Sequence, residues 1–262
     1  MAMIAAPTMA AAVARYTGVR GLIPGGSLQL VRRVLRIGLV LHPAYVALAL
    51  TLRVDLFLVS LLSDARAVGL YSLASSLAEI LFLVSWTMTE SAMKKQTETG
   101  EPAAARYTVW VARQVLTLTV ICAAGVALVA HPMVYVVYGE EWVASVPPLL
   151  ILTCGAVAFA LEGPIRIMMI RMVAPSVIAF AAGAGIIVNV LLNLVLIPRL
   201  GINGAALASV ISYWLYLSLL LRSFHQATGL STRPIFELPR EGDVVLRIAH
   251  SVARRVRHKE SI

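Results

Sequence analysis

The stretch APSVIAFAAGAGIIVNVLLNLVLIP, residues 174–198, contains no charged side chain. A helix needs roughly 20 consecutive apolar residues to cross the hydrocarbon core of a bilayer. Other segments of the chain also meet that length, and their apolar residues form continuous runs instead of the alternating pattern of barrel strands. The sequence therefore predicts an all-α, polytopic membrane helical bundle with six transmembrane helices, at residues 37–61, 68–92, 108–130, 148–171, 174–198 and 203–222.

The composition supports the same fold class. The 262 residues are 60% hydrophobic and 13% charged, whereas an ordinary soluble domain is about half apolar and about a quarter charged. A soluble globular protein and a disordered chain are both excluded by this balance. The connections between the predicted helices are also too short to hold a soluble catalytic domain.

The basic residues predict the orientation of the chain. Lys and Arg outnumber Asp and Glu by 22 to 13, for a net charge of +9, and basic residues beside transmembrane helices favour the cytoplasmic side. With the amino-terminal region inside, only Arg53, Arg66 and Arg199 fall outside or in the outer half of the membrane. We expect a multi-pass protein of the cytoplasmic (inner) membrane with both termini in the cytoplasm.

The two ends of the chain flank the predicted bundle. Residues 1–14 are apolar but too short to cross a membrane, so they are either a surface-lying segment or the stump of a helix. The tail, residues 223–262, is basic, and its stretch 243–260 is amphipathic, which is typical of helices that lie in the plane of the lipid headgroups. Membrane lipid is therefore an expected partner. Nucleic acid is not, because no folded basic module accompanies the charges.

Several ionisable residues lie within the predicted helices, where they cost several kcal/mol unless they face the bundle interior. Arg53 and Glu79 fall on consecutive antiparallel helices at depths that differ by only ~4–5 Å, so they can form an ion pair. Such a pair either neutralises two charges and fixes helix packing, or takes part in binding an anionic substrate. Asp55 is two positions from Arg53, so the two side chains diverge on a helix.

Two positions predict kinks that could act as hinges. Glu162, Gly163 and Pro164 interrupt the fourth predicted helix, and a proline inside a helix removes a backbone hydrogen bond. Broken helices with a charge beside the break are common in transporters. The alternative is that Glu162 simply pairs with Arg166, one turn later. Pro43 is a similar candidate hinge in the first predicted helix.

The sequence gives no reason to expect catalysis. It lacks a Gly-rich phosphate loop ending in Lys-Ser or Lys-Thr, its histidines are scattered, and no Ser-His-Asp arrangement is suggested. We expect no enzyme activity, no catalytic residue, no metal site and no cofactor.

Three groups of motifs resemble polysaccharide (O-antigen, Wzx-like) flippases of the multidrug/oligosaccharidyl-lipid/polysaccharide exporter superfamily. RVDLF at 53–57, VGLYSLA at 68–74 and LAE at 77–79 resemble the seventh and eighth helices of these flippases. YGEEW at 138–142 with VPPL at 146–149 resembles the loop that enters the tenth helix. NVLLNLVLIP at 189–198 with GINGAALA at 201–208 resembles the last two shared helices. The resemblance covers roughly residues 35–222.

The resemblance implies a function and a site. Flippases of this kind move undecaprenyl-diphosphate-linked saccharide from the inner to the outer leaflet, through a cationic cavity between two six-helix lobes. By motif position, Arg53 would line that cavity and meet the diphosphate, for which its planar guanidinium is well suited. Asp55 and Glu79 would be its neighbours, and Arg113 and Glu162 are further candidate cavity residues.

The chain departs from this family in having one predicted lobe instead of two. Residues 1–36 are then the stump of the sixth helix and a basic cytoplasmic linker, and residues 37–222 are the carboxy-terminal six-helix lobe. A single lobe lacks the opposite wall of the cavity. It would have to form a homo-oligomer, pair with a separately encoded second lobe, or be an inactive fragment.

Three functions are therefore compatible with the sequence. The first is flipping of lipid-linked oligosaccharide together with a partner lobe. The second is a structural or assembly role in a polysaccharide pathway without transport. The third is half of a cation-coupled drug antiporter, with Glu79 or Glu162 as the ion-coupled carboxylate.

Overall fold

A computed structural model describes residues 39, 42, 46–47, 49–173 and 175–237. The chain divides into two units, Met1–Pro43 and Ala44–Ile262, and all of the described residues except Leu39 and His42 belong to the second unit. The predicted hinge residue Pro43, the amino-terminal segment 1–36 and the amphipathic stretch 243–260 lie outside the described residues.

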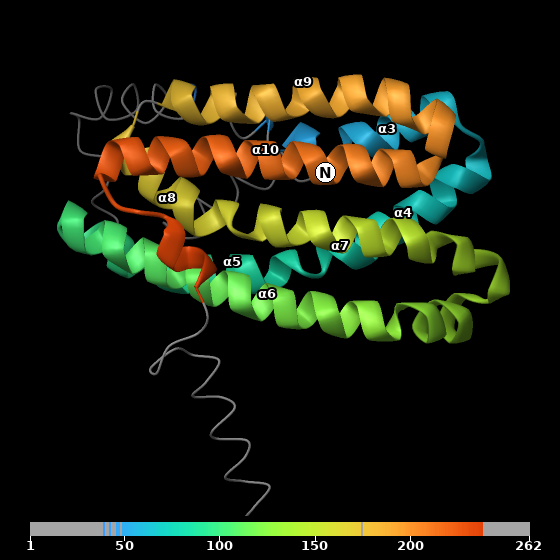
Figure 1. The fold of residues 1–262 in the computed structure, drawn as a ribbon, viewed down its shortest axis with the longest axis horizontal. Helices are drawn as coiled ribbons and strands as arrows, with labels where there is room; N and C mark the ends of the chain where they lie inside the picture. Colours follow the sequence, from blue (N-terminus) through green and yellow to red (C-terminus); the bar gives the residue numbers. More distant parts are fainter. Residues whose placement is uncertain (1–38, 40–41, 43–45, 48, 174, 238–262) are drawn as a thin grey trace, which may run out of the picture. The chain divides into compact units, whose positions relative to one another are not determined.

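The described part of the second unit is built from helices (Figure 1). Their bounds are α3 (Val54–Leu62), α4 (Ala65–Glu79), α5 (Phe82–Glu98), α6 (Glu101–Tyr138), the 3₁₀ helix η1 (Glu140–Ser145), α7 (Val146–Ala160), α8 (Glu162–Met172), α9 (Pro175–Leu200), α10 (Ile202–Thr228) and the 3₁₀ helix η2 (Arg233–Phe236). The all-α prediction is confirmed.

Five segments of the described chain are long and apolar enough to cross a membrane. They are Ala65–Gln96, Glu101–Tyr138, Glu140–Met172, Ser176–Leu200 and Ile202–Thr228. These correspond to the second to sixth predicted helices. The first predicted helix, residues 37–61, lies partly outside the described residues, and α3 forms its carboxy-terminal part. The chain is thus a polytopic membrane bundle.

Three of the predicted transmembrane segments are interrupted. A turn at Leu52 and Arg53 precedes α3, a second at Ile80 and Leu81 separates α4 from α5, and a third at Leu161 separates α7 from α8. The predicted span at 68–92 is confirmed as Ala65–Gln96, and the breaks at 52–53 and 80–81 are features that the sequence analysis did not predict. By contrast, α6, α9 and α10 run without a break.

Helix α10 holds the bundle together, because it packs mainly against α9 and α7 and also contacts α3, α4 and α8. On the other side of α7, helix α6 packs against α5, α7 and α8 (Figure 1). The tilted rings of Phe82, Phe159 and Tyr213 pack in a row between α5, α7 and α10, with ring centroids 4.9 Å and 5.1 Å apart. This aromatic row lies beside the breaks at 80–81 and 161.

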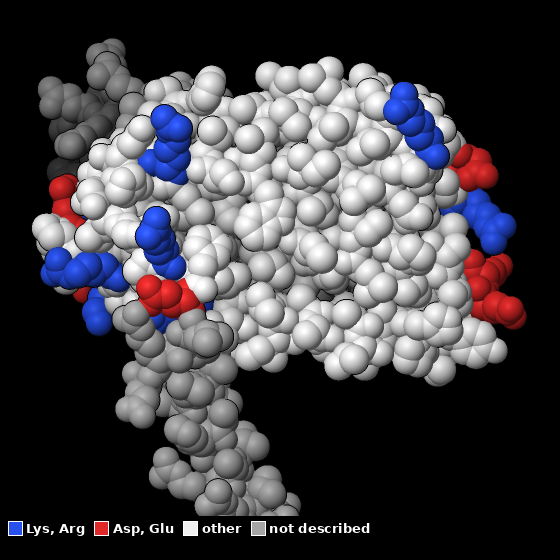
Figure 2. Space-filling view, viewed as in Figure 1, with Lys and Arg blue, Asp and Glu red and all other residues white. Residues whose placement is uncertain are grey.

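The outer surface of the helices is apolar. Large side chains such as Leu128, Val136 and Phe180 are exposed, which a soluble protein of this size would avoid. On the face shown in Figure 2, Lys, Arg, Asp and Glu gather toward the two ends of the helices, with a broad uncharged band between them. This distribution suits a bundle whose middle is surrounded by hydrocarbon.

Candidate functional site

Arg53 and Glu79 form the ion pair that the sequence predicts. Arg53 Nη1 lies 3.1 Å from Glu79 Oε1, and Arg53 Nη2 donates to Glu79 Oε2 at 3.2 Å. The contact is therefore bidentate, the strongest arrangement open to a guanidinium and a carboxylate. The Arg53 side chain is 60% exposed and that of Glu79 is 29% exposed.

The backbone places both partners of this pair at helix ends. Arg53 stands in the turn directly before α3, and Glu79 is the last residue of α4. Helix α3 has 9 residues, so Arg53 lies about 14 Å from the connection to α4. That distance is close to half of a hydrocarbon core about 30 Å thick, which puts the exposed guanidinium near the middle of the bundle.

Asp55 turns the opposite way and is buried. Its Oδ2 accepts hydrogen bonds from the Tyr71 hydroxyl at 2.6 Å and from Ser209 Oγ at 2.7 Å. Its Oδ1 accepts from the Leu56 backbone N–H at 2.7 Å. The divergence of Arg53 and Asp55 is confirmed, and the carboxylate joins α3, α4 and α10 inside the bundle.

The polar network continues from Ser209 into α9. Asn189 Nδ2 donates to Ser209 Oγ at 3.3 Å and to Ser212 Oγ at 3.1 Å. One turn further, Asn193 Nδ2 donates to Asn189 Oδ1 at 2.8 Å. All of these side chains are buried. Side-chain hydrogen bonds of this kind hold transmembrane helices together where apolar packing alone is weakly directional.

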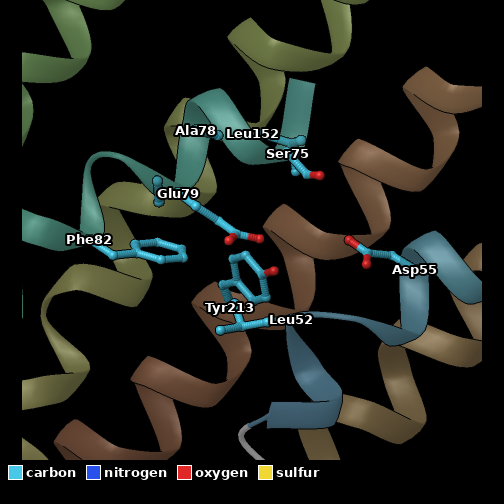
Figure 3. Close-up of a pocket in the computed structure, with 9 residues that line it drawn as sticks. Leu52, Asp55, Ser75, Ala78, Glu79, Phe82, Leu152 and Tyr213 are labelled. Atoms are coloured by element: carbon cyan, nitrogen blue, oxygen red, sulfur yellow. The ribbon is translucent and has the colours of Figure 1, made fainter. Parts of the chain in front are cut away.

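A small cavity lies between the ion pair and this network (Figure 3). Its volume is about 20 Å³, enough for one water molecule. Polar side chains from three helices reach it: Asp55 from α3, Ser75 and Glu79 from α4, and Tyr213 from α10. Apolar side chains make up the rest of the lining. Glu79 therefore has two environments, the exposed guanidinium on one side and a small cavity with a few polar groups on the other.

Glu162 takes part in a separate contact. Its Oε1 accepts from Arg166 Nε at 2.8 Å, which is the local pair that the sequence allowed. The break at Leu161 stands directly before the predicted hinge residues Gly163 and Pro164. Pro164 has no N–H to offer the Ala160 carbonyl, and Ser85 Oγ donates to that carbonyl instead, at 2.5 Å. Whether this break moves stays a prediction.

Arg113 is buried in α6, on the side of the bundle that packs against α5, α7 and α8. The structure thus brings Arg53, Asp55 and Glu79 together and places Glu162 and Arg113 in other surroundings. Among the described residues, no three His, Cys, Asp or Glu side chains lie close enough to hold a metal ion. The substrate-binding roles of all five residues stay predictions.

The sequence analysis missed the partners of Asp55. Tyr71 lies in the VGLYSLA stretch, where no role was assigned to it, and Ser209 lies in a run of small residues that suggests only close packing. A usable signal exists nonetheless, because a carboxylate in an apolar helix requires hydroxyl or amide donors at its own depth. Applied to the neighbouring helices, this requirement limits the candidates to their hydroxyl and amide residues, which include Tyr71 and Ser209, without selecting among them.

Comparison with known proteins places the chain in a family. No curated protein and no solved structure matches it. Residues 4–147, more than half of the chain, match the family described as polysaccharide biosynthesis protein. This region contains both members of the Arg53–Glu79 pair, the Asp55–Tyr71 contact and the broken α4–α5 helix. We conclude that this membrane chain belongs to the polysaccharide biosynthesis protein family.

Proposed function

We propose that the chain is one lobe of a flippase that moves a lipid-linked oligosaccharide across the cytoplasmic membrane. Membership of a polysaccharide biosynthesis family and a polytopic helical bundle both support this function. The connections between the described helices are short, which favours work within the membrane over catalysis in a soluble domain.

One observation carries the proposal, and it is the exposure of Arg53. Its side chain is 60% exposed near the middle of the bundle, where a charge facing hydrocarbon costs several kcal/mol. This face must therefore border water or another protein surface when the chain is in a membrane. A water-filled path with an arginine on its wall suits a diphosphate headgroup, which can accept two parallel hydrogen bonds from the guanidinium.

The second wall of that path is proposed to come from another lobe. Arg53 is paired with Glu79 of the same chain, and its side chain stays 60% exposed. A separately encoded amino-terminal lobe or a second copy of this chain would cover it. Either partner would close the membrane path that a single bundle leaves open.

The ends of the helices support a cytoplasmic placement for one face. The end at which α5 meets α6 and α8 meets α9 carries Lys94, Lys95, Arg106 and Arg171, and the opposite end carries Asp64, Arg66, Glu140, Glu141 and Arg199. The excess of basic residues at the first end is typical of the cytoplasmic side. We therefore propose that this first end faces the cytoplasm.

Complementation tests the proposed function. The chain is expressed in cells that lack the matching flippase, alone and together with an amino-terminal six-helix lobe, and surface polysaccharide is measured. We expect restoration in at least one arm, and loss of restoration with Arg53→Gln. Arg66→Gln is the matched control, because Arg66 is exposed at the end of the helices, away from the pair.

The outcomes separate the candidate functions. Restoration by the chain alone supports a homo-oligomer, and restoration only with the second lobe supports a split flippase. No restoration in either arm, with the chain inserted and abundant, would overturn the transport proposal. Full restoration by the Arg53→Gln variant would favour an assembly role in the pathway, because such a role does not need the guanidinium.

A further inference from the structure

Glu79 occupies the donors of Arg53 that a phosphate group would use. Both terminal nitrogens of the guanidinium are engaged by the two carboxylate oxygens, at 3.1 Å and 3.2 Å. A phosphate binds arginine through the same parallel pair of N–H groups. The same edge of the guanidinium therefore cannot hold Glu79 and a phosphate in this way at once.

We propose that Glu79 is an internal counterion which a diphosphate displaces from Arg53, so that Glu79 sets how strongly an anion must bind to enter the site. This inference rests on the proposed function and describes how the same site admits its ligand. In this role the Glu79 carboxylate competes with the headgroup for Arg53, in addition to neutralising the charge of the guanidinium.

The structure offers Glu79 a second position. The cavity of about 20 Å³ beside it is lined by Asp55, Ser75 and Tyr213 as well as by Glu79 itself. In Figure 3 the side chains of Glu79 and Tyr213 point toward one another across this space. A carboxylate turned toward this cavity would meet the hydroxyl groups of Ser75 and Tyr213 and room for a water molecule. The Asp55 carboxylate also lines the cavity, and the donors that occupy its oxygens reduce its repulsion of a second carboxylate.

The backbone allows the pair to separate without unwinding a helix. Arg53 precedes α3 and Glu79 ends α4, and each stands beside a turn. The Leu81 N–H bonds to the Ala78 carbonyl and the Leu83 N–H to the Ile80 carbonyl, so the turn that follows Glu79 has its own hydrogen bonds. A rotation of the Glu79 side chain would leave these bonds in place.

Competition of this kind weakens the binding of every anion that needs the same donors. A carboxylate tethered beside its partner acts at an effective concentration of the order of millimolar or higher. It lowers the apparent affinity of each such ligand by the same factor, which depends on how often Glu79 leaves Arg53 free. A diphosphate carries more charge and more acceptor oxygens than a monophosphate, so its higher intrinsic affinity for Arg53 overcomes this threshold more readily.

Binding measurements on the full chain test the proposal. The chain is reconstituted in phosphatidylcholine nanodiscs, and dissociation constants are measured by titration calorimetry for farnesyl diphosphate, farnesyl monophosphate and inorganic pyrophosphate. We expect the wild type to prefer the diphosphate over the monophosphate. Glu79→Gln should bind both farnesyl ligands more tightly, by the same factor of roughly five for an ion pair of this exposure, because the competitor is lost for both.

Two further variants complete the test. Glu141→Gln removes an exposed carboxylate in η1 and should leave every dissociation constant unchanged. Glu79→Asp keeps the charge but shortens the side chain by one methylene group, and its dissociation constants should lie between those of the wild type and Glu79→Gln. This second variant keeps the test valid if Glu79→Gln does not yield folded protein.

The results distinguish failure of this inference from failure of the proposed function. If wild type and Glu79→Gln both bind no phosphate ligand, the counterion role is overturned for this chain, and the complementation experiment decides the proposed function separately. If the wild type binds and Arg53→Gln does not, while Glu79→Gln is unchanged or weaker, only the counterion role is overturned. A tighter constant for pyrophosphate in Glu79→Gln assigns the exchange to the diphosphate group, and a gain confined to the farnesyl ligands would contradict it.

Discussion

Asp55 is the residue on which the polar interior of the bundle depends. Three donors from three different sources reach its carboxylate: the Tyr71 hydroxyl, the Ser209 hydroxyl and the Leu56 backbone N–H. A buried carboxylate without such donors would be strongly unfavourable. Arg53, only two positions away, projects outward. Residues 53–55 therefore provide both a buried carboxylate that joins three helices and an exposed cation.

The Tyr71 hydroxyl is expected to stabilise the fold through Asp55. Tyr71→Phe should lower the free energy of unfolding by about 1–2 kcal/mol, because it removes a donor from a buried charged acceptor. In an Asp55→Asn background the same change should cost less, since the acceptor is then neutral. Unfolding by SDS titration in mixed micelles measures both values.

Tyr138→Phe is the control for this prediction. Tyr138 is exposed at the end of α6, and its ring packs against that of Trp142. Its hydroxyl can be removed with little effect on the free energy of unfolding. Equal losses for Tyr71→Phe in the two backgrounds would show that the hydroxyl does not act through Asp55.

At the scale of the elements, the three broken helices contrast with the continuous α6, α9 and α10. The break at Leu161 could be predicted, because Gly163 and Pro164 follow it directly. The break at Ile80 and Leu81 could not, since neither residue disfavours a helix. Its surroundings suggest a tertiary cause: Phe82, the first residue of α5, packs its ring against Phe159 of α7.

Ser85 is expected to compensate for the proline in α8. In Ser85→Ala the Ala160 carbonyl loses its hydroxyl donor, and the free energy of unfolding should fall by about 1 kcal/mol. In a Pro164→Ala background a backbone N–H can reach the same carbonyl, so the loss should become smaller. A double-mutant cycle with the same SDS titration measures this coupling, and a coupling of zero would contradict the interpretation.

Gly204 is expected to be essential for the contact between α9 and α10. A β-carbon at Gly204 would overlap the backbone carbonyl of Leu196, and a backbone cannot move aside as a flexible side chain can. Gly204→Ala should lower the free energy of unfolding by about 1–3 kcal/mol. Gly183→Ala is the matched control, because a β-carbon there meets nothing within 4 Å.

The control variant shows which result would contradict the prediction for Gly204. Gly183→Ala should be neutral or slightly stabilising, because alanine is the better helix former by about 1 kcal/mol. If Gly204→Ala behaved in the same way, the close approach of the two helices would not contribute to stability. Thermal unfolding followed by intrinsic fluorescence gives an independent value for both variants.

At the scale of the whole molecule, hydropathy predicts the fold class but only part of the site. A long apolar run can be recognised without knowing which helix packs against it, so the helices from residue 68 onward could be predicted from their apolar composition alone. The Arg53–Glu79 pair could also be found, because residue spacing gives the depth of each charge. The Asp55 network could not be specified in advance, because hydropathy does not report how helices rotate about their axes.

The orientation of the bundle is a further prediction at this scale. A reporter fused after residue 222 should report the cytoplasm, and one fused after residue 65 should report the outside, because basic residues gather at the first of these ends. Paired fusions to an enzyme active only in the cytoplasm and to one active only outside provide the measurement. The reverse pattern would overturn the charge-based orientation.

Helix α6 has a consequence for the lipids in which the chain can be handled. Its 38 unbroken residues extend for about 57 Å, nearly twice a hydrocarbon core of about 30 Å. The helix must tilt or project into the headgroup and aqueous layers, and each choice changes with bilayer thickness. Acyl-chain length therefore becomes a variable in reconstitution: thin bilayers would leave more of α6 in water, and thick ones would draw it upright.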